Sequence, residues 1–340
     1  MTKPLQRVGR LHEAGRIQLD TAEIPEAEPQ DIVVQVNRAG ICGTDLAIFR
    51  AGSPVPGTVL GHEFSGTVVA AGNRVTGVAA GDRIVANPMM DYLGLGRLPG
   101  AFAEYLRLPE VDVGRNVFVL PDTVSDEAGA LIEPFAVALH AINRARAQVG
   151  ERIVIYGAGP IGICVLVGLK ARGIDGVLVV EPSAHRREMA LGMGASAVHD
   201  PLDGSPTDFV ASHFGMSDAG DGGPASGLAD VAFDCAGVAS SLDAAMLSLR
   251  RRGRLALVAD PQDCPLAPLR LVMLRELEVI GSATYDDEFH EAIDLLASGR
   301  ADLSALVTHR FPLAKISDAF AMQMDSAQAG KVLIVPGIHG

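Results

Sequence analysis

Cysteine is scarce in this 340-residue sequence, which has only four. The cysteines are too widely spaced for the dense disulfide framework of a small secreted protein, and no two form a Cys-x-x-Cys pair that could begin a structural zinc tetrad. The four are Cys42, Cys164, Cys235 and Cys264. Their scarcity favours a reducing compartment, so we predict a cytoplasmic protein without a structural zinc.

Long hydrophobic runs are also missing. Residues 1–15 contain no apolar segment of the kind found in secretory signals. The longest uncharged stretch, 153–169, falls short of the ~20 apolar residues of a membrane span and contains four glycines. We therefore expect neither a cleaved signal nor a membrane anchor.

Positive charge is in deficit, because 28 Lys and Arg face 41 Asp and Glu, for a formal net charge of −13. A nucleic-acid partner needs a basic face, and the one dense basic cluster in the sequence lies between Arg250 and Arg254. We interpret this cluster as the solvated end of a helix that precedes a strand over 255–258. The composition thus favours a small-molecule partner over nucleic acid.

Two kinds of local pattern divide the chain. Residues 31–119 carry short β-type runs separated by Gly and Pro turns, which is typical of an antiparallel, barrel-like β domain. From Arg152 to about Ala283, near-continuous apolar strands alternate with helices, which indicates a parallel sheet covered on both faces. Between the two regions, Ser125 is placed to cap a helix that extends through Leu139.

The length of the chain exceeds the usual size of one hydrophobic core, so two domains are expected. We place a catalytic domain at 1–134 and a dinucleotide-binding domain at 135–283. The remaining segment, 284–340, is too short for a third independent domain and finishes with an apolar strand over 331–335. We expect this segment to return to the catalytic domain.

A glycine-rich turn lies between the first strand and the first helix of the second region. Residues 157–162 are Gly157, Ala158, Gly159, Pro160, Ile161 and Gly162. Strand, glycines, helix, second strand and the acidic Glu181 follow one another in the order of a Rossmann dinucleotide site. In such a site Gly157 permits the tight turn, Gly159 lets the backbone approach a pyrophosphate, and Gly162 lets helix and strand pack closely.

Glu181 predicts which dinucleotide binds. Its carboxylate would accept hydrogen bonds from ribose hydroxyls and would repel a 2′-phosphate, which favours NAD over NADP. Arg186 and Arg187 are close in sequence, and an arginine could pair with that phosphate, so they weaken the preference. We predict NAD and include Arg186 in the cofactor site.

Thiol, imidazole and carboxylate groups gather early in the β region. Cys42, His62 and Glu63 supply donors that suit Zn²⁺, and a catalytic zinc needs three protein ligands and an open position. Taken singly, each of these residues is better explained as structural, so the metal prediction depends on their combination with the dinucleotide motif. The two segments read Gly40-Ile-Cys42-Gly-Thr44-Asp45 and Gly61-His62-Glu63-Phe-Ser-Gly66.

Together these motifs resemble the zinc-containing medium-chain alcohol dehydrogenases, and the resemblance covers essentially the whole chain. The Gly-His-Glu-x-x-Gly segment is characteristic of that family. Residues 131–141, around Glu133, are similar to the corresponding helix of the polyol, threonine and butanediol dehydrogenase branch. The resemblance implies an α/β fold, with a GroES-like β-barrel catalytic domain and a doubly wound Rossmann domain.

The resemblance also implies a ligand set for one catalytic zinc per chain. Cys42 and His62 would bind the metal directly. Glu63 would be a third ligand or a close neighbour of the site, and Glu133 a fourth ligand, directly or through water. Asp45 would orient His62 by accepting the hydrogen on its other ring nitrogen.

Further positions follow from the same resemblance. Thr44 would hydrogen-bond the substrate oxygen and carry its proton away, and Lys331 matches a basic position near the pyrophosphate, with a solvated lysine as an equal alternative. Many relatives carry a relay histidine where this chain has Ala47, and a four-cysteine lobe where it has the cysteine-free segment 87–100. We expect that segment to form a plain loop near the active-site entrance or a subunit contact.

The sequence therefore predicts a homodimer or homotetramer that oxidises a secondary alcohol to the ketone, reversibly and with NAD. The preferred substrate is a diol, polyol, sugar or cyclitol. Two alternatives stay open. The first is a zinc-free enone or quinone reductase of the same fold, against which the presence of Cys42, His62 and Glu63 argues. The second is a non-catalytic NAD- or zinc-binding protein, for which the absence of the relay histidine at Ala47 is the only support.

Overall fold

A computed structural model of the protein divides the chain into two compact units. The described residues are 3–53, 55–218, 225–260 and 269–337, so Cys264 lies outside them. Unit 1 contains Met1–Glu133, Phe289–Gly299 and Val307–Gly340, and unit 2 contains Pro134–Glu288 and Arg300–Leu306. Within the described residues, no helix combines the length and the apolar character required to cross a membrane.

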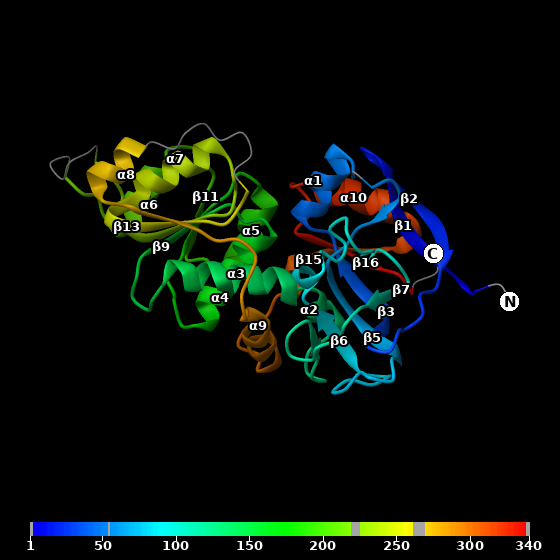
Figure 1. Ribbon diagram of the computed structural model, residues 1–340. Helices are drawn as coiled ribbons and strands as arrows, with labels where there is room; N and C mark the ends of the chain where they lie inside the picture. Colours follow the sequence, from blue (N-terminus) through cyan, green and yellow to red (C-terminus); the bar gives the residue numbers. More distant parts are fainter. Residues whose placement is uncertain (1–2, 54, 219–224, 261–268, 338–340) are drawn as a thin grey trace. The chain divides into compact units, whose positions relative to one another are not determined.

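Unit 1 is built on two sheets, in which most neighbouring strands are antiparallel (Figure 1). The smaller sheet has the order β2-β1-β4, with β1 at Leu5–Glu13, β2 at Arg16–Glu23 and β4 at Thr58–Val59. The larger sheet has the order β15-β16-β3-β5-β6-β8, and β7 pairs with β3. Its strands are β3 (Ile32–Gly40), β5 (Glu63–Ala71), β6 (Arg83–Ala86), β7 (Tyr105–Leu108), β8 (Val117–Val119), β15 (Val307–Pro312) and β16 (Lys331–Val335).

The core of unit 1 follows from the strand period of two. Ile32, Val34 and Val36 alternate along β3 and are buried together in one apolar cluster. The C-terminal strand β16 completes this sheet, because Leu333 and Ile334 pair in antiparallel register with the last residues of β3. The helical elements of the unit are α1 (Gly43–Ala51), η1 (Pro88–Met90), α2 (Asp126–Ala130), α9 (Glu288–Ala297), η3 (Leu313–Lys315) and α10 (Ile316–Met324).

Unit 2 contains a six-stranded parallel sheet in the order β11-β10-β9-β12-β13-β14. Numbered from β9, this is the strand order of a Rossmann fold, and helices lie on both faces of the sheet (Figure 1). The strands are β9 (Ile153–Tyr156), β10 (Leu178–Val180), β11 (Ala197–His199), β12 (Ala229–Asp234), β13 (Leu249–Leu257) and β14 (Glu278–Gly281). The helical elements are α4 (Pro160–Ala171), α5 (Ala184–Gly192), α6 (Pro206–Phe214), α7 (Ala239–Ser248), α8 (Leu269–Arg275) and η2 (Ser304–Leu306). The α/β fold expected from the sequence is confirmed.

The single helix expected from Ser125 to Leu139 is two helices. The Ser125 side chain caps α2 by accepting a hydrogen bond from the Ala128 amide at 3.2 Å. The chain then breaks at Leu131, and α3 runs over Ile132–Ala145. The break has a local cause, because Pro134 has no amide hydrogen to continue the first helix and is tolerated only in the first turn of a new one.

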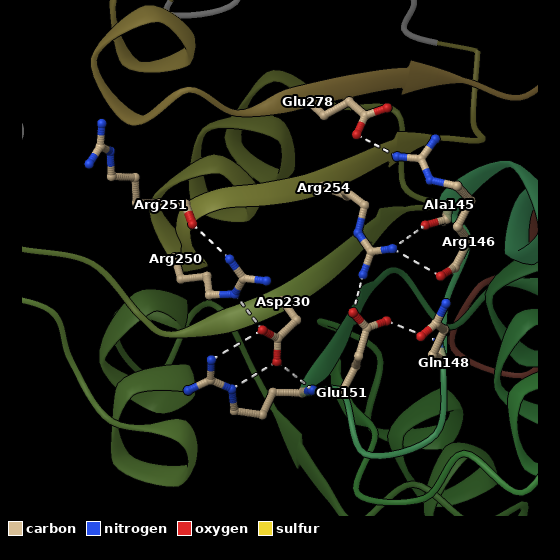
Figure 2. Close-up of polar contacts among 10 residues, drawn as sticks. Ala145, Arg146, Gln148, Glu151, Asp230, Arg250, Arg251, Arg254 and Glu278 are labelled. Atoms are coloured by element: carbon tan, nitrogen blue, oxygen red, sulfur yellow. Dashed lines mark hydrogen bonds and ion pairs between the residues drawn. The ribbon is translucent and has the colours of Figure 1, made fainter.

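The basic cluster at 250–254 is strand and not the end of a helix, so that interpretation was wrong. β13 already begins at Leu249 and includes all of these arginines. Their side chains reach neighbouring strands and loops, and Figure 2 shows Arg250 paired with Asp230 and Arg254 paired with Glu151. The pairs are Arg152 and Arg250 with Asp230, Arg251 and Arg252 with Glu276, Arg254 with Glu151, and Arg146 with Glu278. We call these six arginines and four acids the arginine cluster.

Candidate active site

Three potential metal ligands meet at one end of the β3–β5 pair. Gly40, the last residue of β3, lies opposite Glu63, the first residue of β5, so the antiparallel register brings together residues about twenty positions apart. Cys42 follows β3 as the N-cap of α1, and His62 directly precedes β5. The ligand atoms of Cys42, His62 and Glu63 all lie within 4.8 Å of one another.

The approach to His62 depends on a glycine. Gly61 has φ +97°, in the region that side chains rarely adopt. A Cβ at this position would lie 2.8 Å from a ring carbon of Phe102, which is fully buried. A larger residue at 61 would therefore displace His62 from the other two ligands.

Asp45 is fully buried and ties the two ligand segments together. Its Oδ2 accepts a hydrogen bond from the Cys42 amide at 2.9 Å, and its Oδ1 accepts one from the Gly61 amide at 3.2 Å. His62 Nδ1 lies 3.5 Å from the same Oδ1 and has no hydrogen-bond partner among the described residues. Burial alone would lower the pKa of His62, but Asp45 and Cys42 outweigh it and raise that pKa well above its usual value.

A buried ion pair completes the cluster. Lys331 Nζ lies 2.6 and 2.7 Å from the two carboxylate oxygens of Glu63 and donates to the Ile41 carbonyl at 3.3 Å. The Lys331 side chain is 2% exposed and that of Glu63 is 0% exposed. We call Cys42, Asp45, His62, Glu63 and Lys331 the metal cluster.

Lys331 forms a contact that the sequence did not predict. As the first residue of β16, it pairs with Glu63 at the start of β5, and its expected role near a pyrophosphate stays a prediction. No local pattern could have revealed this contact, because the two residues are 268 positions apart. Only the return of β16 to the sheet of β3 brings them together.

The metal cluster fits a divalent cation. In the state that binds a metal, with Cys42 as thiolate and His62 neutral, three anionic groups face the cation Lys331, which leaves two negative charges in the cluster. Uncompensated buried charge is costly, so a dication would neutralise the cluster. Thiolate, imidazole and carboxylate are also the donors that Zn²⁺ prefers, and three of them leave a coordination position open.

The other residues expected near the metal are differently placed. Glu133 is buried in the first turn of α3, but among the described residues it is not part of the group whose ligand atoms converge. Thr44 is exposed in the first turn of α1. Ala47 lies on α1 one turn after Thr44 and is half-buried. Its methyl side chain cannot carry a proton as a histidine at this position would.

The glycine-rich turn has the geometry that a dinucleotide needs. Gly157 has φ +93°, and Gly159 is the N-cap of α4, whose first residue is Pro160. A Cβ on Gly162 would lie 1.9 Å from the Gly157 carbonyl oxygen, so helix and strand approach too closely for any side chain. Ile161 continues the first turn of α4, whose free amides point toward the turn.

Glu181 follows β10 beside this turn. Its Oε2 accepts a hydrogen bond from the Ala158 amide at 2.7 Å, and its Oε1 accepts one from the Ser183 amide at 2.9 Å. Arg186 lies near Gly159, and burial lowers its pKa while Glu181 opposes that shift. Arg187 is instead paired with Asp200 at 2.8 Å. Of the two arginines, Arg186 is therefore the one next to the glycines.

Comparison with known proteins gives consistent results for both units. The family model of the alcohol dehydrogenase GroES-like domain matches residues 28–122, and that of the zinc-binding dehydrogenases matches residues 160–298. A sorbitol dehydrogenase of Ovis aries is 32% identical over 91% of this chain and 91% of its own length. A 2-dehydro-3-deoxy-L-galactonate 5-dehydrogenase of Pseudoalteromonas atlantica is 32% identical over 89% of this chain and 91% of its own length.

A solved structure agrees with the fold along nearly the whole chain. It is a zinc-binding dehydrogenase from Sinorhizobium meliloti 1021 bound to NADP, 29% identical in sequence, with a TM-score of 0.84. The match covers 98% of this chain and 100% of that one.

Proposed function

Because the chain belongs to the zinc-containing medium-chain alcohol dehydrogenase family, in its polyol branch, we propose that it oxidises a secondary alcohol to the ketone, reversibly and with NAD⁺. The protein is an oxidoreductase whose cofactors are zinc and a nicotinamide dinucleotide. The proposed substrate is a diol, polyol, sugar or cyclitol. The convergence of Cys42, His62 and Glu63 is the observation that carries the proposal.

Each residue of the metal cluster has a separate task in this proposal. Cys42, His62 and Glu63 would hold the zinc, which, together with NAD⁺, supplies the Lewis acid and the hydride acceptor of the reaction. Asp45 holds the two ligand segments in register through the amides of residues 42 and 61. Lys331 supplies a buried positive charge beside the Glu63 carboxylate.

Thr44 and Glu133 complete the proposed site. The Thr44 hydroxyl would accept a hydrogen bond from the substrate hydroxyl and pass the proton on to solvent, since Ala47 offers no imidazole. Glu133 would act at the metal directly or through water. Both roles come from the family resemblance, and the convergent ligand group does not include Glu133.

The cofactor residues are proposed on the same basis. Gly157, Gly159, Pro160, Ile161 and Gly162 would bind the pyrophosphate through backbone amides at the start of α4. The carboxylate that follows β10 would bind the ribose hydroxyls and favour NAD. Arg186 beside the turn would bind a phosphate of the cofactor. If the enzyme used NADP, Arg186 would also have to pair with its 2′-phosphate.

The remaining proposals concern the setting of the enzyme. We propose a homodimer or homotetramer in the cytoplasm that acts on small molecules, with neither nucleic acid nor membrane as partner. The net charge of −13 supports the exclusion of nucleic acid.

One experiment tests the proposed function. Zinc content is measured in the purified protein, and NADH formation is followed across a panel of diols, hexitols, cyclitols and amino alcohols. We expect about one zinc per chain and turnover of at least one vicinal diol or polyol with NAD⁺. A zinc-free protein that reduces enones or quinones would refute the proposal, as would a zinc-loaded protein that turns over no alcohol.

A further inference from the structure

A hollow of about 770 Å³ lies beside α1 in unit 1. One wall is formed by helix residues and the other by the segment that follows η1, which replaces a cysteine-rich lobe. Its lining includes Ala47, Ile48 and Ala51 on α1, and Tyr92, Leu95 and Arg97 on the opposite wall. All of them belong to one compact unit, the unit that also holds the metal cluster.

Thr44 does not itself line the hollow, but it lies one turn before the lining residues Ala47 and Ile48 on α1. Residues three and four positions apart on a helix share a face, so Ala47 and Ile48 lie on the face of α1 that carries Thr44. Ala51 continues this face by one more turn, about 10 Å along the axis from Thr44. A substrate whose hydroxyl contacts Thr44 can therefore extend its carbon chain along the helix into the hollow.

The hollow has mainly apolar walls and a single charged side chain. The α1 wall is apolar, and so is Leu95, which suits the C–H faces of a carbon chain. Arg97 is the one charged side chain that lines the hollow, and it is exposed. Within the described part of the chain it forms no ion pair, whereas most arginines of this acidic protein are matched with carboxylates.

We propose that this hollow receives the distal part of the substrate and that Arg97 binds an anionic group there, either a carboxylate or a phosphate. The inference rests on the proposed function and narrows its substrate class to anionic polyhydroxy compounds, such as sugar acids or sugar phosphates. A guanidinium forms paired, charge-assisted hydrogen bonds with both kinds of anion. It also offsets locally the repulsion that a protein of net charge −13 exerts on an anionic substrate.

The test compares Arg97→Gln with Arg50→Gln. Arg50 is an exposed arginine on the same helix and does not line the hollow, so its substitution removes the same charge elsewhere. For each protein, kcat/KM is measured on an aldonate, the corresponding hexitol and the hexitol phosphate. The aldonate and the phosphate distinguish the two anion classes.

We expect the wild-type enzyme to prefer an anionic substrate to the neutral hexitol. Arg97→Gln should lower kcat/KM on the anion about tenfold, as for the loss of a charge-assisted hydrogen bond in a partly solvated place. It should leave the hexitol within about twofold, and Arg50→Gln should change neither. The anion preference should also weaken as salt is added, because the guanidinium is solvent-accessible.

Equal losses on the neutral and anionic substrates in Arg97→Gln would overturn the inference, as would a wild-type enzyme without anion preference. If zinc is present and the hexitol is oxidised but Arg97 has no effect, this inference fails and the proposed function stands. If no alcohol is turned over, the proposed function fails. In that case the dissociation constant for the aldonate is measured by calorimetry for wild type and for Arg97→Gln. Weaker binding by Arg97→Gln would support the inference that Arg97 binds the anion, and equal binding would refute it.

Discussion

The two units each contain a cluster of charged side chains, and the two clusters differ in the sign of their excess charge and in burial. In the arginine cluster of unit 2, every arginine contacts a carboxylate, and several members reach solvent. In the metal cluster of unit 1, Glu63 and Asp45 are fully buried, the buried His62 Nδ1 has no hydrogen-bond partner among the described residues, and acidic groups outnumber the one lysine. The paired, partly exposed arginine cluster stabilises the fold, whereas the buried metal cluster is suited to bind a cation.

The largest effect should come from removing a metal ligand. Cys42→Ser keeps the size of the side chain but replaces the thiolate with a hydroxyl that binds zinc poorly. We expect loss of bound zinc together with a fall in kcat of about a thousandfold or more, since a Lewis acid contributes several kcal/mol. Elemental analysis and steady-state kinetics measure the two losses. A zinc-free variant with near-normal activity would show that the metal cluster is not catalytic.

Removal of the buried counter-charge should destabilise the fold. Lys331→Met leaves the Glu63 carboxylate buried and unpaired, which costs about 3–5 kcal/mol of unfolding free energy. Chemical denaturation of zinc-free protein measures this loss, and adding zinc should recover part of it. The control is the double variant with Glu63→Gln, which should be more stable than Lys331→Met alone. A Lys331→Met protein as stable as the wild type would refute this account of the pair.

A substitution at the centre of the arginine cluster, Asp230→Asn, should have a smaller effect on stability than Lys331→Met. Asp230 accepts hydrogen bonds from the Arg152 amide and side chain at 2.9 Å and pairs with Arg250. Burial opposes ionisation, but the hydrogen bonds from Arg152 and Arg250 outweigh it and hold the pKa of Asp230 well below its usual value. Asp230→Asn should therefore cost about 2 kcal/mol of unfolding free energy at neutral pH.

This loss should depend on pH with a definite sign. Because the pKa of Asp230 is lower in the folded state, its stabilisation is fully present above the unfolded pKa of about 3.9 and is lost as pH falls through the folded pKa. The stability difference between wild type and Asp230→Asn should thus be constant near neutrality and shrink below about pH 4. A difference that instead widened in acid would contradict the assignment.

The smallest effect is expected at the exposed edge of the arginine cluster. Arg252 pairs with Glu276 at 2.6 Å, but both side chains are largely solvent-exposed. Arg252→Gln should leave the denaturation midpoint unchanged within error, because exposed ion pairs are screened by water and salt. A shift as large as that of Asp230→Asn would show that the cluster acts as one cooperative network.

Some features of the two units could be predicted from the sequence and others could not. The α/β fold and the glycine turn follow from patterns within short segments, and the structure confirms the fold. Gly157 and Gly162 are examples, since the turn gives Gly157 a positive φ and leaves no room for a Cβ on Gly162, which would lie 1.9 Å from the Gly157 carbonyl oxygen. By contrast, the break at Leu131 was missed because apolar periodicity continues across it, although Pro134 was the local signal.

Local sequence is enough to specify which chemical groups are available, namely a thiol, an imidazole and a carboxylate in two motifs, and a glycine turn followed by an acid. These are local properties of covalent structure and backbone conformation. Which charges meet depends on the tertiary fold. Strand pairing placed Lys331 on Glu63 and Arg250 of β13 on Asp230, because register and burial, not distance along the chain, select the partner of a buried charge.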